Sequence, residues 1–240
     1  GGTLKQRLNR YWSREHNLPP VEETSNLIED IARALDYAHS RSVIHRDVKP
    51  GNIMFDAHGQ AYLVDFGIAR VASRVDSETS MFAGKAYTVN YAAPELISGE
   101  AITPAVDQYA LAVVAYAMLA GRLPFEGKTP VDIEYKHLHE RPMPAHQVRR
   151  ELPRSVSVVL ERALAKAPEE RYPTVTAFAQ ALTAALRGEG KKALPVRWIG
   201  LAVGGVASVA LAGVGPASLA GPSPQPTSEP LTQVAAPLAT

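Results

Sequence analysis

The sequence contains no cysteine among its 240 residues. This absence excludes disulfide bonds, thiolate metal sites and a cysteine nucleophile, and it is compatible with a reducing compartment. The chain also has little net charge, because 25 lysines and arginines oppose 24 aspartates and glutamates, for a formal net charge of +1. A strongly basic footprint for nucleic acid is therefore missing, and we expect no nucleic-acid partner.

The first residue is glycine rather than methionine, and we expect no signal peptide in this sequence, because its first segment is polar and rich in arginine. We interpret the missing methionine as a sign that the sequence begins inside a longer protein; a processed N-terminus is the alternative. Composition divides the chain into a globular domain over 1–187, a basic linker over 188–197, an uncharged run over 198–215 and a Pro/Ser/Thr/Ala-rich tail over 216–240.

Hydrophobic periodicity predicts that the globular domain is mostly helical. Apolar residues recur at helical spacing over 21–41, and the run 104–121 is apolar on nearly all sides, as in a helix buried in a core. Two more amphipathic helices are expected over 154–165 and 176–187.

Short strand-like runs over 43–45, 52–56 and 61–65 predict a small β element. Turn residues separate the last two runs, which we expect to pair as a hairpin. Asn52 and Asp65 would then lie near each other at one end of it. Their oxygen atoms would suit Mg²⁺ held jointly with phosphate.

Asp47 and Lys49 lie at the end of the first of these runs. Such groups are either the solvated ends of strands or part of a site for a highly charged ligand, since buried charge is costly unless it is paired. In such a site Lys49 would place positive charge on a transferred phosphoryl group, and Asp47 would orient a hydroxyl and accept its proton.

Three motifs resemble those of the protein kinases. HRDVKPGN over 45–52 resembles their catalytic loop, DFG over 65–67 their metal-binding motif, and APE over 93–95 the end of their activation segment. Lysine two residues after the aspartate is similar to the serine/threonine branch, and VIHRDVKPGNIM, DFGIAR and GRLPF resemble its bacterial members. The resemblance covers 1–187 and implies a mainly α (α+β) fold, the large C-terminal lobe of a protein kinase.

The resemblance also implies roles for individual residues. Asp47 is then the catalytic base, Lys49 contacts phosphate, and Met54 forms the floor of the adenine pocket. Thr88 takes the threonine position of the serine/threonine branch. The expected catalytic residues are Asp47, Lys49 and Thr88, the expected cofactor-binding residues are Lys49, Asn52, Met54 and Asp65, and the expected metal ligands are Asn52 and Asp65. ATP and Mg²⁺ are the implied cofactors.

Three further residues match structural positions of the family. Asp107 corresponds to the aspartate that ties down the catalytic-loop backbone, and Arg171 to the arginine that pairs with the glutamate of APE, here Glu95. If that pair is buried, removing one partner would cost ~3–5 kcal/mol; the alternative is a surface pair that contributes almost nothing. The histidines without a family match show no metal-ligand spacing and are expected at the surface: His16, His39, His58 and His146.

Arg46 lies where the family often has an arginine that receives a phosphate from the activation loop. Such a phosphate would add about −1.5 to −2 charges and order the loop through arginine contacts. The candidate acceptors are Ser77, Thr79 and Ser80, unless this segment is only a polar loop. The family usually has Gly-Thr-Pro or similar before the following tyrosine, whereas this chain has Tyr87-Thr88-Val89, which affects how substrates would be presented.

No G-x-G-x-x-G loop and no V-A-I-K-like strand precedes Asp47, although the family carries both in a smaller lobe. The opening GGTLKQRL resembles the exit of the hinge between the lobes. We therefore expect a piece of a longer serine/threonine protein kinase, inactive or nearly so by itself, whose substrates are Ser/Thr-containing proteins. The alternative is a non-catalytic lobe that acts as a docking or scaffold module, although the retained catalytic residues favour an enzyme.

The uncharged run over 198–215 predicts a single transmembrane helix, with an Ala/Gly-rich linker as the alternative. Basic residues precede the run and none follow it, so the kinase-like domain is expected in the cytoplasm at the cell membrane and the disordered tail outside. Small residues recur every four positions at Gly200, Gly204, Ser208 and Ala212, a spacing that permits a homodimer.

Overall fold

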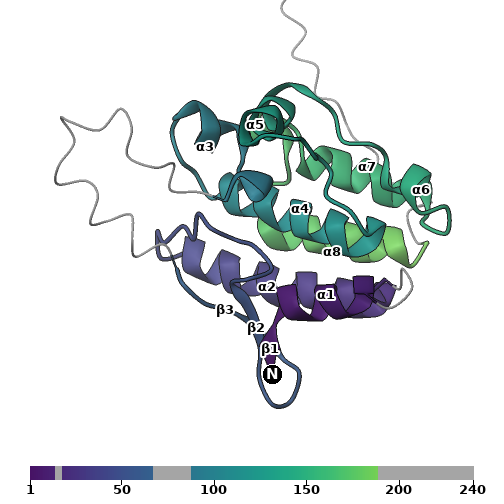
Figure 1. Ribbon diagram of the computed structural model, residues 1–240. Coiled ribbons are helices and arrows are strands. Elements are labelled where there is room, and N and C mark those ends of the chain that lie inside the picture. Colours follow the sequence, from purple (N-terminus) through teal and green to yellow (C-terminus); the bar gives the residue numbers. More distant parts are fainter. Residues whose placement is uncertain (14–17, 67–87, 189–240) are drawn as a thin grey trace, which may run out of the picture. The chain divides into compact units, whose positions relative to one another are not determined.

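Three helices pack on one another at the centre of the structure: α2 (Val21–His39), α4 (Ala105–Ala120) and α8 (Val175–Leu186) (Figure 1). The computed structural model describes residues 1–13, 18–66 and 88–188. Helix α4 is buried along nearly its whole length because its sequence is apolar on all sides. These helices confirm the predicted ones to within a few residues at each end.

The remaining helices surround this centre. Helix α7 (Arg154–Ala163) packs against α8, as its amphipathic sequence predicted. The shorter helices α3 (Pro94–Ser98), α5 (Pro130–His139) and α6 (Ala145–Val148) were not predicted. In the described part of the chain, 3₁₀ turns also occur at Val89–Tyr91 and Pro168–Glu170.

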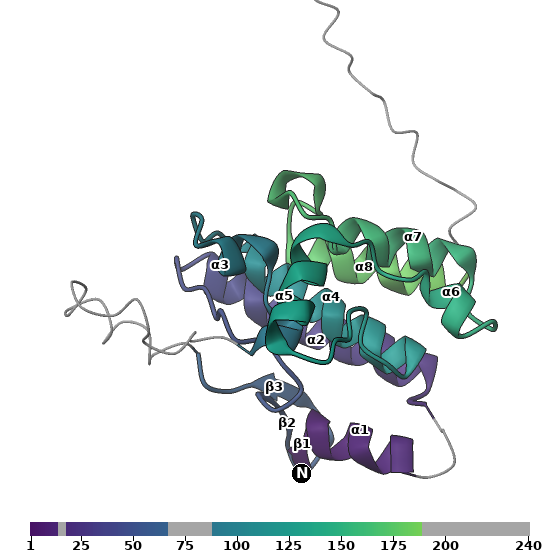
Figure 2. The same ribbon diagram turned by 45° about the horizontal axis from the view of Figure 1, so that its top comes forward.

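A three-stranded antiparallel sheet lies near the first residues of the chain, beside α1 (Leu4–Ser13) (Figure 2). Its strands are β1 (Gly2–Thr3), β2 (Ile53–Phe55) and β3 (Ala61–Leu63), in the order β1-β2-β3. The β2–β3 pairing confirms the predicted hairpin. Strand β1 and helix α1 were not predicted, since two residues of strand carry no periodicity.

The run Val43–His45 is not a strand in the structure, so that prediction was wrong. The backbone N–H of Val43 donates to the Ala38 carbonyl, and the N–H of His45 donates to the carboxylate of Asp107. Because these donors are bound to α2 and α4, they are not free for a strand ladder.

The predicted membrane span over 198–215 and the tail over 216–240 lie outside the described residues, as does the linker apart from Gly188. No helix within 1–13, 18–66 or 88–188 is long and apolar enough to cross a membrane. The candidate phosphate acceptors Ser77, Thr79 and Ser80 also lie outside the described residues.

Candidate functional site

The carboxylate of Asp47 is held from three sides. Lys49 Nζ lies 2.6 Å from Oδ2, and the hydroxyl of Thr88 donates to Oδ1 at 3.2 Å. Asn52 Nδ2 donates to Oδ2 at 3.0 Å and to the Asp47 carbonyl at 2.9 Å. Lys49 Nζ also donates to Thr88 Oγ1 at 3.0 Å, which closes the group. The structure therefore brings three of the predicted site residues, Lys49, Asn52 and Thr88, around the carboxylate of a fourth, Asp47.

Asp65 lies at the same end of the hairpin as Asn52. The N–H of Val64 donates to the Asn52 carbonyl at 2.9 Å, so Asp65 follows directly after the residue paired with Asn52. Asp65 is exposed and has a φ of 60°, a left-handed conformation that is uncommon for a residue other than glycine. Within the described residues no side chain pairs with its carboxylate. The predicted proximity of Asn52 and Asp65 agrees with this arrangement.

Met54 occupies the middle of β2, opposite Tyr62 on β3 and Thr3 on β1. Its neighbours Ile53 and Phe55 are buried, and successive side chains of a strand point to opposite faces. Met54 therefore lies on the more open face of the sheet. That position is compatible with its predicted role as the floor of a nucleotide pocket.

The loop that carries Asp47 is anchored by the buried carboxylate of Asp107. Its Oδ2 accepts the N–H of His45 at 2.8 Å, and its Oδ1 accepts the N–H of Arg46 at 2.7 Å. These bonds hold Arg46 at a φ of 66°, another left-handed conformation. The predicted role of Asp107 in tying down this backbone is confirmed.

His39 completes this anchor and was missed by the sequence analysis. Its Nε2 donates to Asp107 Oδ2 at 2.7 Å, and its side chain is only 9% exposed, so its placement at the surface was wrong. His45 is fully buried; Asp47 N–H donates to its Nδ1, so its Nε2 carries the proton and donates to the Val64 carbonyl at 3.0 Å. His45 thereby links the loop of Asp47 to the segment before Asp65.

The other unmatched histidines differ among themselves. His146 is partly buried, and its Nδ1 lies 2.7 Å from the hydroxyl of Ser157, so its surface prediction was wrong as well. His58 is exposed in the hairpin turn, as predicted. His16 lies outside the described residues. No group of three or more His, Asp or Glu side chains capable of holding a metal occurs in the described part of the chain.

Arg46 was predicted to receive a phosphate. Its Nε is buried and has no hydrogen-bond partner among the residues that the structure describes. Because an unpaired buried donor is unfavourable, this atom is suited to an anion. The predicted acceptors lie outside the described residues, so the phosphate contact stays a prediction.

Glu95 and Arg171 form a buried ion pair, as the resemblance implied. Two bonds of 2.7 Å join the guanidinium to the carboxylate, and the side chains are 2% and 0% exposed. The guanidinium also donates to the main-chain oxygens of Ala105, Ala165 and Lys166. All five of its N–H donors are thereby used. The pair ties the start of α3 to the start of α4 and to the segment after α7.

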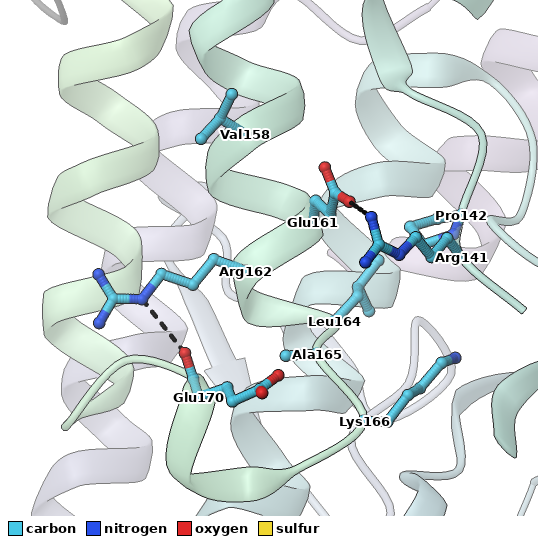
Figure 3. Close-up of a pocket in the computed structure, with 9 residues that line it drawn as sticks. All are labelled: Arg141, Pro142, Val158, Glu161, Arg162, Leu164, Ala165, Lys166 and Glu170. Carbon is cyan, nitrogen blue, oxygen red and sulfur yellow. Dashed lines mark hydrogen bonds and ion pairs between the residues drawn. The ribbon is translucent and has the colours of Figure 1, made fainter. Parts of the chain in front are cut away.

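Two pockets of similar volume have different characters. One, of about 400 Å³, is lined by residues around the end of α7. There Arg141 contacts Glu161, Arg162 donates to the Glu170 carbonyl, and Lys166 points away from Arg162 and Glu170 (Figure 3). Burial lowers the pKa of Lys166 to about 8, with Arg171 adding to the effect, and its Nζ donates to the His137 carbonyl at 2.6 Å. Each of these charged groups has its own partner, and they do not point to one common position. The pocket therefore offers no cluster of groups that could act together on a substrate.

The second pocket, of about 370 Å³, lies between α1 and the loop of Asp47, and we name it the α1 pocket. Its lining includes Lys5, Trp12, Lys49, Gly51, Thr88 and Tyr91. Lys49 and Thr88 both contact Asp47, so this pocket adjoins the candidate site.

A sequence model of the protein kinase domain matches residues 1–183 of the chain. The chain belongs to the protein kinase family. The HRD, DFG and APE sequences at 45–47, 65–67 and 93–95 therefore lie within a protein kinase domain.

Curated relatives include bacterial kinases. The serine/threonine-protein kinase PknB of Mycobacterium tuberculosis is 36% identical over 167 residues, which cover 70% of this chain and 27% of PknB. The serine/threonine-protein kinase PknA of the same species is 38% identical over 164 residues, which cover 68% of this chain and 37% of PknA. PknB of Mycobacterium leprae is 37% identical over 155 residues, covering 65% and 25% of the two chains. The matched segment thus spans well under half the length of these relatives.

Proposed function

We propose that this chain is the catalytic-loop lobe of a serine/threonine protein kinase, which transfers the γ-phosphate of ATP to hydroxyl groups of proteins. The observation that carries the proposal is the Asp47 carboxylate, oriented by Lys49, Asn52 and Thr88 on a loop that Asp107 anchors. The lysine two residues after Asp47 and the names of the relatives favour serine and threonine as acceptors.

In this reaction Asp47 accepts the proton of the substrate hydroxyl. The hydroxyl oxygen forms a bond to the γ-phosphorus, the bond from that phosphorus to the β–γ bridging oxygen breaks, and ADP leaves. The ammonium of Lys49 lies beside Asp47 and would balance charge on the moving phosphoryl group. Asp47 then releases its proton to water.

Asn52 and Asp65 fit the role of Mg²⁺ ligands. Both N–H groups of Asn52 point to Asp47, so its side-chain oxygen is directed away from that carboxylate. The Asp65 carboxylate is exposed, with no partner in the described part of the chain. Mg²⁺ is commonly held by one or two protein oxygens together with phosphates. When bound, the ion would neutralise charge on the phosphate oxygens.

The test is phosphotransfer to matched peptides whose acceptor is Ser, Thr or Tyr, measured on the longest protein that carries this sequence. We expect transfer to Ser and Thr, little to Tyr, and none above background in the Asp47→Asn variant. Transfer to Tyr alone, or equal transfer by the variant, would contradict the proposal.

We further propose that the 240-residue chain by itself transfers phosphate slowly or not at all. The sequence before Asp47 contains neither a Gly-rich loop nor a strand lysine to position the triphosphate, and positioning supplies much of the rate in such reactions. Turnover of ATP by the chain alone, above an Asp47→Ala control, would contradict this proposal. If the longest protein binds partners but never transfers phosphate, the docking-module alternative would replace the enzyme.

We also propose that the lobe is anchored at the cell membrane by a helix over 198–215 and faces the cytoplasm. The support is the uncharged run and the basic residues that precede it. Membrane fractionation of the full chain, compared with a chain ending at Arg187, tests this; equal recovery in the soluble fraction would refute it. The stripe Gly200, Gly204, Ser208 and Ala212 would then support a homodimer, which crosslinking in membranes would detect.

A further inference from the structure

The α1 pocket opens directly beside the proposed base. Its volume of about 370 Å³ is in the range of ligand pockets, ~300–1,000 Å³. Two of its lining residues, Lys49 and Thr88, contact the Asp47 carboxylate. A peptide whose hydroxyl reaches Asp47 would therefore place neighbouring side chains in or next to this pocket.

The wall formed by α1 is fixed relative to the loop. The N–H of Lys5 donates to the Pro50 carbonyl at 2.9 Å, and Leu4 and Leu8 are buried in the core. On the loop side, residue 51 is glycine, where an added Cβ would meet only Lys49 Cε, at 4.0 Å. The Lys5 main chain is thus tied to the loop that carries Asp47, while Lys5 itself is exposed.

The lining has an excess of positive charge. None of the described residues that line the pocket is acidic. The Lys49 ammonium is neutralised by Asp47, but the Lys5 ammonium has no carboxylate partner among the described residues. Helix α1 has no acidic residue in its first turn, where the helix dipole is itself positive.

Two aromatic residues of the lining, Trp12 and Tyr91, add apolar surface and carry no negative charge. Trp12 is 38% exposed, so its ring is available for contact. Burial raises the pKa of Tyr91 to about 12, so its hydroxyl stays neutral at physiological pH.

We propose that the α1 pocket selects acidic substrate peptides: an Asp or Glu a few residues from the phosphate-accepting Ser or Thr binds Lys5, and Trp12 and Tyr91 cover its aliphatic part. This proposal rests on the proposed function, because it takes Asp47 as the point to which the acceptor hydroxyl binds. It names Lys5 as a specificity-determining residue rather than a catalytic one.

The test is a binding titration without ATP, using short peptides with a central Ser in an otherwise Ala/Gly background. Glu, Lys, Leu or Ala is placed in turn at each of the three positions on either side of the Ser. The 240-residue chain is titrated with each peptide by NMR, following the indole N–H signal of Trp12, which a Trp12→Phe variant assigns. The variants are Lys5→Glu and, as a control with the same charge change on the same helix outside the pocket, Arg10→Glu.

We expect Glu to strengthen binding over Ala by about fivefold at one or two positions, the ratio that corresponds to ~1 kcal/mol for one solvated ion pair. Lys5→Glu should reverse the order of the Glu and Lys peptides, whereas Arg10→Glu should leave it unchanged. Equal binding of all peptides, a preference for Leu, or equal effects of the two variants would overturn the proposal.

Phosphotransfer to the same peptides by the longest protein separates this proposal from the proposed function. Transfer without any preference for Glu refutes the α1 pocket and leaves the kinase assignment standing. Binding with a Glu preference but without transfer leaves the pocket standing and refutes the kinase assignment.

Discussion

Two ion pairs of nearly equal length lie in opposite surroundings in this lobe. Arg171 and Glu95 are joined at 2.7 Å with side chains 0% and 2% exposed, whereas Lys49 and Asp47 are joined at 2.6 Å with side chains 28% and 31% exposed. The buried pair uses every donor of its guanidinium on protein groups, whereas solvent reaches part of the open pair. The same contact therefore serves the fold in one region and, under the proposed function, the reaction in the other.

The largest expected effect concerns the open pair. Asp47→Asn should lower phosphotransfer by about 10²- to 10⁴-fold, because the amide cannot accept the hydroxyl proton. The stability should change by less than ~1 kcal/mol, since the ion pair that is lost is half-exposed. Steady-state rates and urea unfolding of the same variant check both statements. A variant that unfolds at much lower urea would show that this pair serves the fold too.

The buried pair should behave in the opposite way. Arg171→Met should destabilise the lobe by ~3–5 kcal/mol, because the carboxylate of Glu95 is left buried without a partner. The double variant Arg171→Met with Glu95→Leu should recover part of the loss, since no stranded charge remains. Urea unfolding measures both; a double variant no more stable than the single one would contradict this account.

Asp107 is buried in the core and also anchors the loop of Asp47. Its removal should therefore lower both the stability of the lobe and the phosphotransfer rate. Asp107→Asn replaces one accepting oxygen of a fully buried carboxylate with an NH₂ group, facing the N–H of Arg46 or of His45 and His39. We expect a loss of ~1.5–3 kcal/mol, the range for a hydrogen bond to a charged group. The phosphotransfer rate should also fall. Asp30→Asn, at a half-exposed carboxylate of α2, is the control and should do neither.

Acid should lower the free energy of unfolding of the lobe through the buried side chain of His137. Burial, together with the charge of Lys166, lowers the pKa of His137 to about 3 from its usual 6.5. The unfolded chain therefore binds the proton first, so the stability from this group is complete above pH 6.5 and is lost as pH falls towards 3, by ~1.4 kcal/mol per pH unit. Urea unfolding between pH 7 and 5 should show a smaller slope for His137→Gln and an unchanged slope for exposed His58→Gln.

The smallest effect is expected at a third ion pair, which lies at the surface. Arg122 and Glu126 are joined at 2.6 Å, but their side chains are 48% and 49% exposed. Arg122→Ala should change the stability by less than ~1 kcal/mol, because water screens the pair. A loss as large as that of Arg171→Met would show that distance, rather than burial, sets the strength of these contacts.

Much of the fold and of the candidate site was predictable from the sequence, and the exceptions have physical reasons. The long helices α2 and α4 follow from periodicity, and the pairing of Glu95 with Arg171 from the family resemblance. His39 was misplaced because no spacing rule relates it to Asp107, a contact that only the packing of α2 on α4 creates. The run 43–45 is apolar and β-branched like a strand, yet its hydrogen bonds go to α2 and α4.

The α1 pocket could not be predicted either. Lys5 and Lys49 are far apart in the sequence, and the bond from Lys5 N–H to the Pro50 carbonyl that brings their segments together involves only main-chain atoms. A bond between main-chain atoms does not depend on the type of side chain, so the sequence pattern does not predict it.

The capping of α8 has a consequence for how the lobe is made. Asp36, on α2, accepts the N–H groups of Val175 and Thr176, the latter 140 residues further along the chain. At ~5–20 residues per second on the ribosome, about 7 to 28 seconds pass between the synthesis of Asp36 and that of its partners on α8. During that time the part of α2 that packs on α8 is exposed. Helix α2 therefore reaches its final surroundings only after α8 has been synthesised, well after the loop that carries Asp47.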